Sequence, residues 1–367
     1  MVGCLAALMW VYLGRQVVLP TWIPSPDGGP PHVAVYANPQ PLDPPKIAPL
    51  PKDEQPTAWQ FPYIVSGYEN LDPYAKGGAD LRLRVFSQSA QVQTNLAIPV
   101  ARMLMLIYEL SYQRLSIDHA FQYNNGIIDV YLCDGGQPGG EQRFLPDDEG
   151  DRHKTANCIF IYQVSTFTDP TEKAREVAHE YGHATLPGIG GYTKPEDWAN
   201  GLLGEKLFLS WMREEMVAGR VTPDDTMGAN ANQLGLWLAK NVQPLVTRAA
   251  AYPPSEKTLA RKDKVGMDTY LGLAMYAATI LPHKVFARSI KLTGSTHATD
   301  YPQALILACA EPDVYALRFP AYLQGKKVWV PIGAAKISGA KQLQKKGAWV
   351  EIIPGKVLVM VAPKRSG

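Results

Sequence analysis

Several common functional signals are missing from this 367-residue sequence. It contains no phosphate-binding G-x-x-x-x-G-K-[ST] loop and no block rich in Lys and Arg, and its formal net charge is only +2. A protein that binds the nucleic-acid backbone needs clustered positive charge to neutralise the phosphates. We therefore expect no nucleic-acid partner.

Cysteine is also scarce, and the four cysteines contain no C-x-x-C pair. This spacing argues against a zinc ribbon and against a thioredoxin-type redox site. Cys133 and Cys158 each lie in a strand-like run and could form one disulfide in an exported protein. Small buried thiols are equally consistent with these positions, so both alternatives stay open.

A long hydrophobic run is absent as well. The apolar stretch at residues 2–13 (VGCLAALMWVYL) is shorter than the roughly 20 residues that a membrane span needs, but it has the length of a signal-peptide core. We expect residues 1–19 to be a signal peptide or an N-terminal anchor, which predicts a secreted, periplasmic or membrane-anchored protein. A buried apolar terminus is the alternative, and any membrane contact would be through this segment.

Proline is concentrated in one place. Residues 20–62 hold thirteen of the 31 prolines, in runs such as PLDPPKIAPLP. Proline cannot donate a backbone hydrogen bond, so this composition is typical of an extended linker. We expect the linker to lead into a folded domain at residues 63–310, followed by a small β subdomain at residues 311–367.

The pattern of apolar residues predicts an α+β fold. The expected strands are at residues 81–86, 127–133 and 157–164, with a Gly- and acid-rich loop at 134–150. The expected helices cover residues 92–115, 198–216, about 226–251, 267–290 with a break at Pro282, and 301–310. Short strands dominate after residue 314.

The most informative segment is His179-Glu180-Tyr181-Gly182-His183, an H-E-x-x-H motif. On a helix, positions i and i+4 lie on the same face, so the two imidazoles can converge on one metal ion. Glu180 can then take a proton from a water activated by the metal. Asp169 is a suitable N-cap and Pro170 suits the first helical position, so the sequence predicts the required helix.

A hydrolytic zinc site needs a third protein ligand. One possible third ligand is the last His of the longer motif H-E-x-x-H-x-x-G-x-x-H. This sequence does not match that motif, because Leu186 and Ile189 occupy the required Gly and His positions. An Asp in a downstream loop is matched only loosely by Asp268. Glu205 is the preferred candidate, since small neighbours such as Gly204 would allow its helix to approach closely. Glu196 and Asp197 stand at the expected helix start, where acidic residues serve the helix dipole.

Together, these features make residues 81–216 similar to the gluzincin branch of the zincin metallopeptidases. The resemblance implies a zincin-like domain with a mixed sheet and active-site helices, with one Zn²⁺ per chain bound by His179, His183 and Glu205. It also implies that Glu180 is the general base and that the substrate is a peptide or protein. The pattern departs from the family at Gly204, where Asn is usual, and at residues 208 and 209, where Phe and Leu replace an acidic or small residue.

Such enzymes also need a group that stabilises the oxyanion, often Tyr or His. The candidates are Tyr192 and His297, with Tyr270 and His283 as further possibilities. We expect the strand at 157–164 to be a sheet edge that an extended substrate joins. Two other functions stay open: hydrolysis of a non-peptide amide, and a catalytically silent zincin-fold protein that binds at a surface.

Overall fold

The computed structural model describes residues 20–38, 41–49, 58–69, 80–117, 126–146, 155–310, 313–332, 335–355 and 358–362. The expected signal or anchor at 1–19 lies outside the described residues. The chain divides into two compact units. Unit 1 comprises Met1–Tyr112, Ile117–Thr185 and Phe208–Gly235, and unit 2 comprises Gln113–Ser116, Leu186–Leu207 and Leu236–Gly367.

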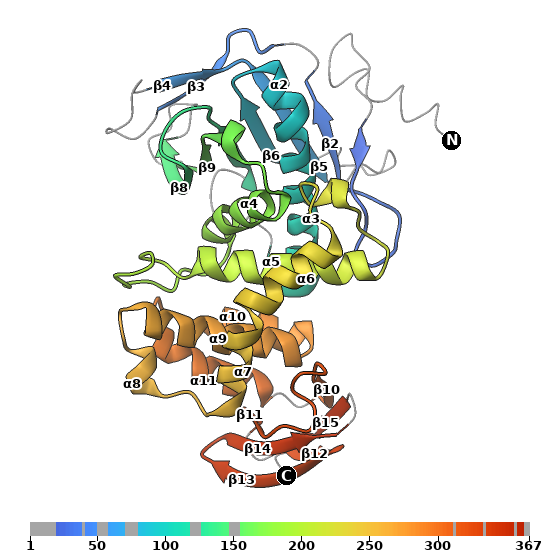
Figure 1. The fold of residues 1–367 in the computed structure, drawn as a ribbon, viewed down its shortest axis with the longest axis vertical. Coiled ribbons are helices and arrows are strands. Elements are labelled where there is room, and N and C mark those ends of the chain that lie inside the picture. Colours follow the sequence, from blue (N-terminus) through green and yellow to red (C-terminus); the bar gives the residue numbers. More distant parts are fainter. Residues whose placement is uncertain are drawn as a thin grey trace. The chain divides into compact units, whose positions relative to one another are not determined.

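Unit 1 is built on a mixed seven-stranded sheet in the order β1-β2-β5-β6-β7-β9-β8 (Figure 1). The inner strands β6, β7 and β9 are parallel, and the remaining pairings are antiparallel. The strands are β1 (Thr21–Trp22), β2 (Ala34–Ala37), β5 (Tyr63–Glu69), β6 (Asp80–Ser87), β7 (Ile128–Leu132), β8 (Gly139–Pro146) and β9 (Thr155–Tyr162). The three strands expected from the sequence are confirmed as β6, β7 and β9.

One face of this sheet is aromatic. Phe86, Tyr131 and Phe160 occupy neighbouring register positions on the three parallel strands, and their stacked rings have centroids 5.2 and 4.9 Å apart. A separate hairpin, β3 (Lys46–Pro49) and β4 (Ala58–Phe61), contributes Trp59 and Phe61 to the same buried cluster. Burial of these large rings is a major source of stability for the sheet.

Cys133 and Cys158 lie in this aromatic cluster as buried thiols. They do not form the disulfide that the sequence left open. Cys309 is a third buried thiol, and Cys4 lies outside the described residues.

The opposite face of the sheet is covered by helices. Gly67 on β5 lies under helix α3 (Ile98–Leu115), because an added Cβ there would be 2.5 Å from Met105 Sδ. Helix α4 (Pro170–Thr185) contacts β8 and β9. The helix expected at 92–115 is confirmed, with a short turn α2 (Ala90–Val92) and a π-helical turn η1 (Gln93–Ala97) before α3.

Two expectations for unit 1 need correction. The segment 134–150 contains strand β8, so it is not entirely a loop. Strand β9 lies between β7 and β8, so the edge strand at this end of the sheet is β8 and not the strand predicted at 157–164.

The proline-rich segment 20–62 also differs from the extended linker that we expected. Strand β2 pairs with β5 and extends the main sheet, and β3 and β4 form the hairpin over its aromatic face. The four residues of β2, AVYA, contain no proline and can therefore use all their backbone hydrogen bonds. These parts of the segment belong to the folded unit.

Helices α5 (Asn200–Val217) and α6 (Ala231–Asn241) contribute residues to both units. Short 3-10 turns are η4 (Val164–Thr166) and η5 (Pro223–Asp225) in unit 1 and η6 (Ala298–Asp300) in unit 2. The other helices of unit 2 are α7 (Gln243–Ala251), α8 (Glu256–Leu259), α9 (Lys264–Ile280), α10 (His283–Leu292) and α11 (Tyr301–Cys309). The break expected at Pro282 is confirmed between α9 and α10.

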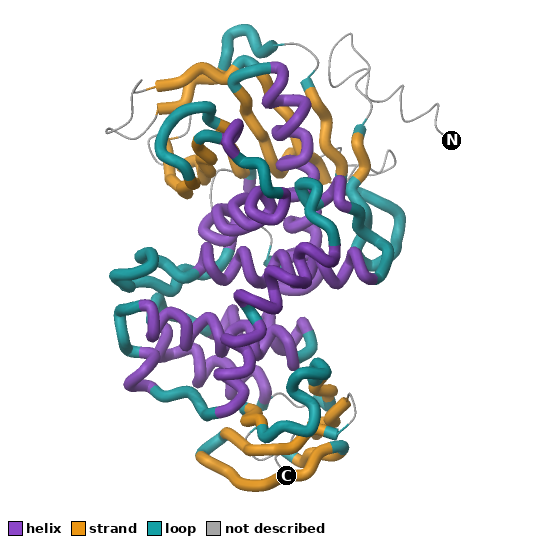
Figure 2. Tube along the Cα trace, in the orientation of Figure 1, coloured by secondary structure: helices purple, strands orange, loops and turns teal. Residues whose placement is uncertain are grey.

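The C-terminal part of unit 2 is made of strands, as the sequence predicts (Figure 2). Two three-stranded sheets have the orders β10-β15-β12 and β11-β14-β13. The strands are β10 (Tyr315–Arg318), β11 (Val328–Val330), β12 (Lys336–Ser338), β13 (Ala340–Lys346), β14 (Trp349–Pro354) and β15 (Leu358–Ala362). No helix in the described ranges has both the length and the apolar character needed to cross a membrane.

Candidate metal centre

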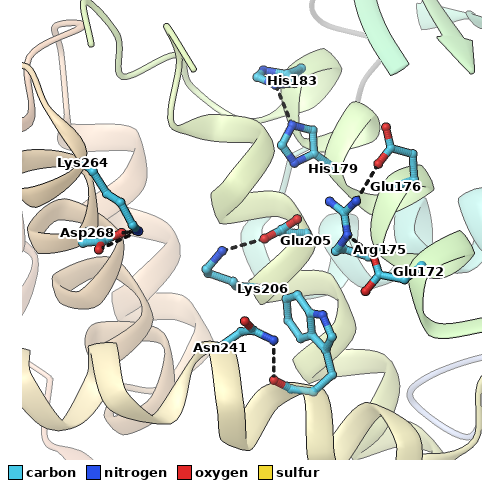
Figure 3. Close-up of polar contacts among 11 residues, drawn as sticks. Glu172, Arg175, Glu176, His179, His183, Glu205, Lys206, Asn241, Lys264 and Asp268 are labelled. Carbon is cyan, nitrogen blue, oxygen red and sulfur yellow. Dashed lines mark hydrogen bonds and ion pairs between the residues drawn. The ribbon is translucent and has the colours of Figure 1, made fainter. Parts of the chain in front are cut away.

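Helix α4 carries the H-E-x-x-H motif, and its start is fixed by Asp169. The Asp169 carboxylate accepts hydrogen bonds from the backbone N–H groups of Thr171 and Glu172 at 2.8 and 3.0 Å. This confirms the predicted N-cap and satisfies two of the backbone donors that a helix start leaves unpaired. Arg175 links Glu172 and Glu176 along the first turns, at 2.7 and 2.9 Å (Figure 3).

The far end of α4 is anchored to the sheet of unit 1. The Asn157 side chain on β9 donates a hydrogen bond to the carbonyl of Ala184 at 2.9 Å. Tyr181 is only 1% exposed and meets Phe208 edge-to-face, with ring centroids 5.7 Å apart. The turns that carry the two His are therefore held between a strand and a buried aromatic pair.

The two His side chains of the motif converge. The Nε2 atoms of His179 and His183 are 3.1 Å apart (Figure 3). Two nitrogens bound to one tetrahedral Zn²⁺ at about 2.05 Å would be separated by about 3.3 Å. The observed separation thus fits two ligands of a common ion.

Glu180 lies on the same helix and is 3% exposed. Its side chain packs against Gly140 of β8, where an added Cβ would be 2.6 Å from Glu180 Cγ and 2.8 Å from Oε1. A larger residue at position 140 would therefore compete with Glu180 for space. The edge strand and the proposed general base are in direct contact.

A third donor comes from the loop that follows α4. The loop folds back on itself, because Gly190 and Trp198 form a β-bridge. The backbone N–H of Ala199 donates to Ile189 O at 2.8 Å, and the backbone N–H of Tyr192 donates to Asp197 O at 3.2 Å. Glu196 stands in this loop. Ligand atoms of His179, His183 and Glu196 all lie within 4.8 Å of one another, so this group could hold a metal ion.

Sequence reasoning placed Glu196 at a helix start and passed over it as a ligand. Helix α5 instead begins at Asn200, so Glu196 is a loop residue. The available signal was an acidic residue thirteen positions after His183 in a Gly-containing loop. That signal is too common in sequences to identify a ligand, because the back-folding of the loop decides where the carboxylate lies.

Glu205, the ligand expected from the sequence, is not part of this three-residue group. It is 4% exposed and pairs with Lys206, whose Nζ is 2.6 Å from Glu205 Oε1 (Figure 3). Lys206 also lies over the Trp237 ring, 5.9 Å from its centroid. The role of Glu205 as a metal ligand stays a prediction.

The candidates for the oxyanion stabiliser differ in their surroundings. Tyr192 is 4% exposed, and its hydroxyl has no hydrogen-bond partner among the described residues. Burial raises the pKa of Tyr192 to about 12, so the hydroxyl keeps its proton at neutral pH. His297 is exposed, on a segment joined to the Tyr192 loop by a hydrogen bond from Gly190 N to Thr296 O at 3.0 Å.

The two further candidates are placed differently. Tyr270 on α9 is fully enclosed and packs edge-to-face on Tyr301, and burial holds its pKa well above the usual value. His283 is the first residue of α10 and is exposed.

In comparisons with known proteins, no protein-family model and no curated protein matches this sequence.

Proposed function

We propose that this protein is a zinc-dependent metallopeptidase with a zincin-like catalytic domain. The observation that carries the proposal is the pair of His179 and His183 Nε2 atoms, 3.1 Å apart on α4, with buried Glu180 beside the first of them. Two imidazoles and a neighbouring carboxylate in this order are the groups that metal-assisted hydrolysis requires.

Zinc is the metal that the donor set favours. Two imidazole nitrogens plus one carboxylate oxygen form a common set for hydrolytic zinc and leave a position open for water. His179, His183 and Glu196 would hold the ion, with Glu205 as the alternative third ligand. When bound, the ion would polarise the scissile carbonyl and lower the pKa of the attacking water.

The chain's own residues perform the proton transfers. Glu180 would take a proton from the water as it attacks the carbonyl carbon, and would later give that proton to the leaving amine. Its contact with Gly140 restricts the positions that its carboxylate can adopt. Tyr192, with a buried and protonated hydroxyl, is our candidate for donating a hydrogen bond to the oxyanion.

The edge position of β8 supports a peptide as the substrate. An extended peptide can pair with an exposed sheet edge through its backbone, which gives affinity without sequence specificity. Strand β8 is one of the two edge strands, and its residue Gly140 contacts Glu180. A substrate paired there would run past the general base. A hydrolase of small non-peptide amides would use the same acid–base chemistry but would gain nothing from this edge.

We also propose that the protein is exported. The apolar segment at residues 2–13 supports export, with the protein secreted, periplasmic or anchored at its N-terminus. Peptides or proteins outside the cytoplasm would then be its substrates.

The decisive experiment compares the wild-type protein with Glu180→Gln. We expect about one zinc per chain in both proteins, measured by elemental analysis, and cleavage of a peptide library by the wild type alone. Gln keeps the shape of Glu but cannot act as a base. Equal cleavage by both proteins, or an absence of zinc from the wild type, would refute the proposed mechanism.

A further inference from the structure

Positive charge is concentrated at the C-terminal end of the sequence. Residues 314–367 contain ten Lys and Arg residues and a single acidic residue, Glu351, so their formal charge is +9. Residues 1–313 therefore carry −7, although the formal charge of the whole chain is only +2. A charge asymmetry of this size within one chain indicates a surface that meets a negatively charged partner.

The cationic side chains of this segment lie on the surface of unit 2. All seven that belong to the described residues are exposed, namely Arg318, Lys326, Lys327, Lys336, Lys341, Lys345 and Lys346. The side chain of Glu351 is instead buried, and it accepts a hydrogen bond from Gln344 at 3.0 Å. The exposed charge in the described part of this segment is thus entirely positive.

The central strand of the sheet β10-β15-β12 carries apolar side chains on its outward face (Figure 1). Leu358 and Met360 on β15 are 48% and 40% exposed, whereas Val359 and Val361 are buried. The alternation follows from the two-residue period of a strand, in which successive side chains point to opposite faces. Antiparallel strands with one face in water usually carry polar residues at the outward positions. The outward apolar pair on β15 therefore needs an explanation.

The two flanking strands add cations to the same face. Arg318 on β10 lies opposite Leu358. Lys336 on β12 lies opposite Ala362, which is two positions along β15 from Met360. Residues that lie opposite each other in neighbouring strands project to the same face of a sheet. The outward face thus has an apolar pair on its central strand and one cation on either side.

Three further lysines lie on β13, which follows β12 in the chain and is an edge strand of the sheet β11-β14-β13. Lysine on an edge strand hinders pairing with other chains, and this accounts for cations on β13, β10 and β12. It does not account for Leu358 and Met360, because exposed apolar side chains make a surface more adhesive. A partner that is both anionic and apolar accounts for the whole face.

We propose that the outward face of the sheet β10-β15-β12 binds the surface of an anionic phospholipid membrane. Leu358 and Met360 would enter the boundary between headgroups and acyl chains, where apolar contact adds affinity in proportion to the buried area. Arg318 and Lys336 would lie at the level of the phosphates, and the lysines of β13 would add attraction over a longer distance. The nucleic-acid backbone also attracts cations, but it offers no apolar layer for aliphatic side chains.

This contact would be additional to the membrane contact expected from residues 1–19. The two can be distinguished by their dependence on lipid charge. The apolar stretch at residues 2–13 contains no charged residue, so its insertion does not require an anionic lipid. Binding through the cationic face does require one.

The test measures how the full chain partitions onto vesicles, by co-sedimentation. Vesicles of phosphatidylcholine alone are compared with vesicles that also contain phosphatidylglycerol, an anionic lipid. The charge variant is the double substitution Arg318→Gln and Lys336→Gln. Its matched control is Lys240→Gln and Lys257→Gln, which removes two exposed charges from helices of the same unit.

A second variant tests the apolar pair. Leu358→Gln and Met360→Gln are combined, and the matched control combines Leu292→Gln and Leu307→Gln, which replace exposed apolar side chains on α10 and α11. The comparison of the two lipids with the wild type needs no variant, so it tests the proposal even if a substitution unfolds the sheet.

We expect phosphatidylglycerol to strengthen binding of the wild type. The charge variant should bind these vesicles about tenfold or more weakly, because each Lys or Arg near an anionic surface contributes about fivefold in affinity. The apolar variant should bind them about threefold or more weakly, since less apolar area is buried. Both controls should match the wild type, and higher ionic strength should weaken the part of the binding that needs phosphatidylglycerol.

Equal binding of the wild type to the two kinds of vesicle would overturn the proposal. So would a preference for phosphatidylglycerol that the charge variant retains, because this face would then not be its source. If the charge variant binds weakly while the apolar variant matches the wild type, the surface is an electrostatic site for polyanions in general. The proposal of a membrane surface would then also be wrong.

The result is independent of peptidase activity. A variant that lacks His179 and His183 should bind the vesicles as the wild type does, because neither residue belongs to unit 2.

Discussion

The side chain of Glu180 lies directly against Gly140, with 2.6 Å between Glu180 Cγ and the position that a Cβ on Gly140 would occupy. Separations this short between non-bonded carbons are strongly repulsive, so one group has to move if a methyl group is added. Because Gly140 belongs to a paired strand, the movement would fall on the Glu180 side chain.

Gly140→Ala should therefore impair catalysis more than metal binding. We expect peptide turnover to fall by about tenfold or more and stability to fall by about 1–3 kcal/mol, the usual cost of overpacking, while zinc content stays unchanged. The control is Gly294→Ala, because an added Cβ at Gly294 meets no atom within 4 Å. Turnover in Gly140→Ala equal to that of the control would show that the position of Glu180 does not depend on this contact.

The elements encoded by local signals were predictable from the sequence. Helix α4 begins where Asp169 and Pro170 indicate, and Pro282 separates α9 from α10. Strand β6 follows the alternating pattern of LRLRVF. In each case, the residues that determine the structure lie within the segment itself.

The elements that depend on distant partners were not predictable. Strand β8 has the sequence GGEQRFLP, which is typical of a loop, and it becomes a strand through pairing with β9. Glu196 lies in a loop that closes through the Gly190–Trp198 bridge, and its carboxylate belongs to the group of three potential ligands. A single sequence contains no local signal for either contact.

Stability should depend on pH through His32 in unit 1. Its Nε2 is 3.1 Å from Glu109, which is 1% exposed, and this hydrogen bond raises the pKa of His32 above 6.5. The protonated imidazole is thus favoured in the folded state. Its stabilisation is fully present below pH 6.5 and is lost as the pH rises through the raised pKa.

Urea unfolding of the wild type and His32→Gln at pH 5.5 and 8.5 measures this effect. The wild type should lose more stability than the variant over this interval, by roughly 1 kcal/mol or less, since the His32 side chain is 39% exposed and partly screened. Titration of other groups cancels in the comparison. An identical pH dependence in the two proteins would contradict the assignment.

Tyr192→Phe removes one hydroxyl and leaves the ring in place. If this hydroxyl stabilises the oxyanion, turnover should fall by on the order of 100-fold with zinc content unchanged. Tyr276→Phe is a matched control, since Tyr276 on α9 also has a buried hydroxyl without a hydrogen-bond partner in the described part of the chain. His297→Asn tests the other candidate. A large loss in His297→Asn, with Tyr192→Phe fully active, would transfer the role to His297.

The third metal ligand can be identified by comparing Glu196→Ala with Glu205→Ala. We expect Glu196→Ala to weaken zinc binding by at least about 100-fold in a titration with a chromophoric chelator, because it removes a donor from the group of three. Glu205→Ala should instead lower the stability of the metal-free protein. Lys206 would then lose the carboxylate that lies 2.6 Å away, and removing one partner of a buried ion pair is destabilising.

Glu205→Gln refines this comparison, since an amide oxygen can still accept a hydrogen bond from Lys206. It should recover part of the stability lost in Glu205→Ala and keep zinc affinity near that of the wild type. If both Glu205 variants lose zinc while Glu196→Ala retains it, the third ligand is Glu205, as the resemblance to gluzincins implies. The Lys206 ammonium would then lie beside a metal ligand, where it would draw electron density from the carboxylate and weaken its donation to the ion.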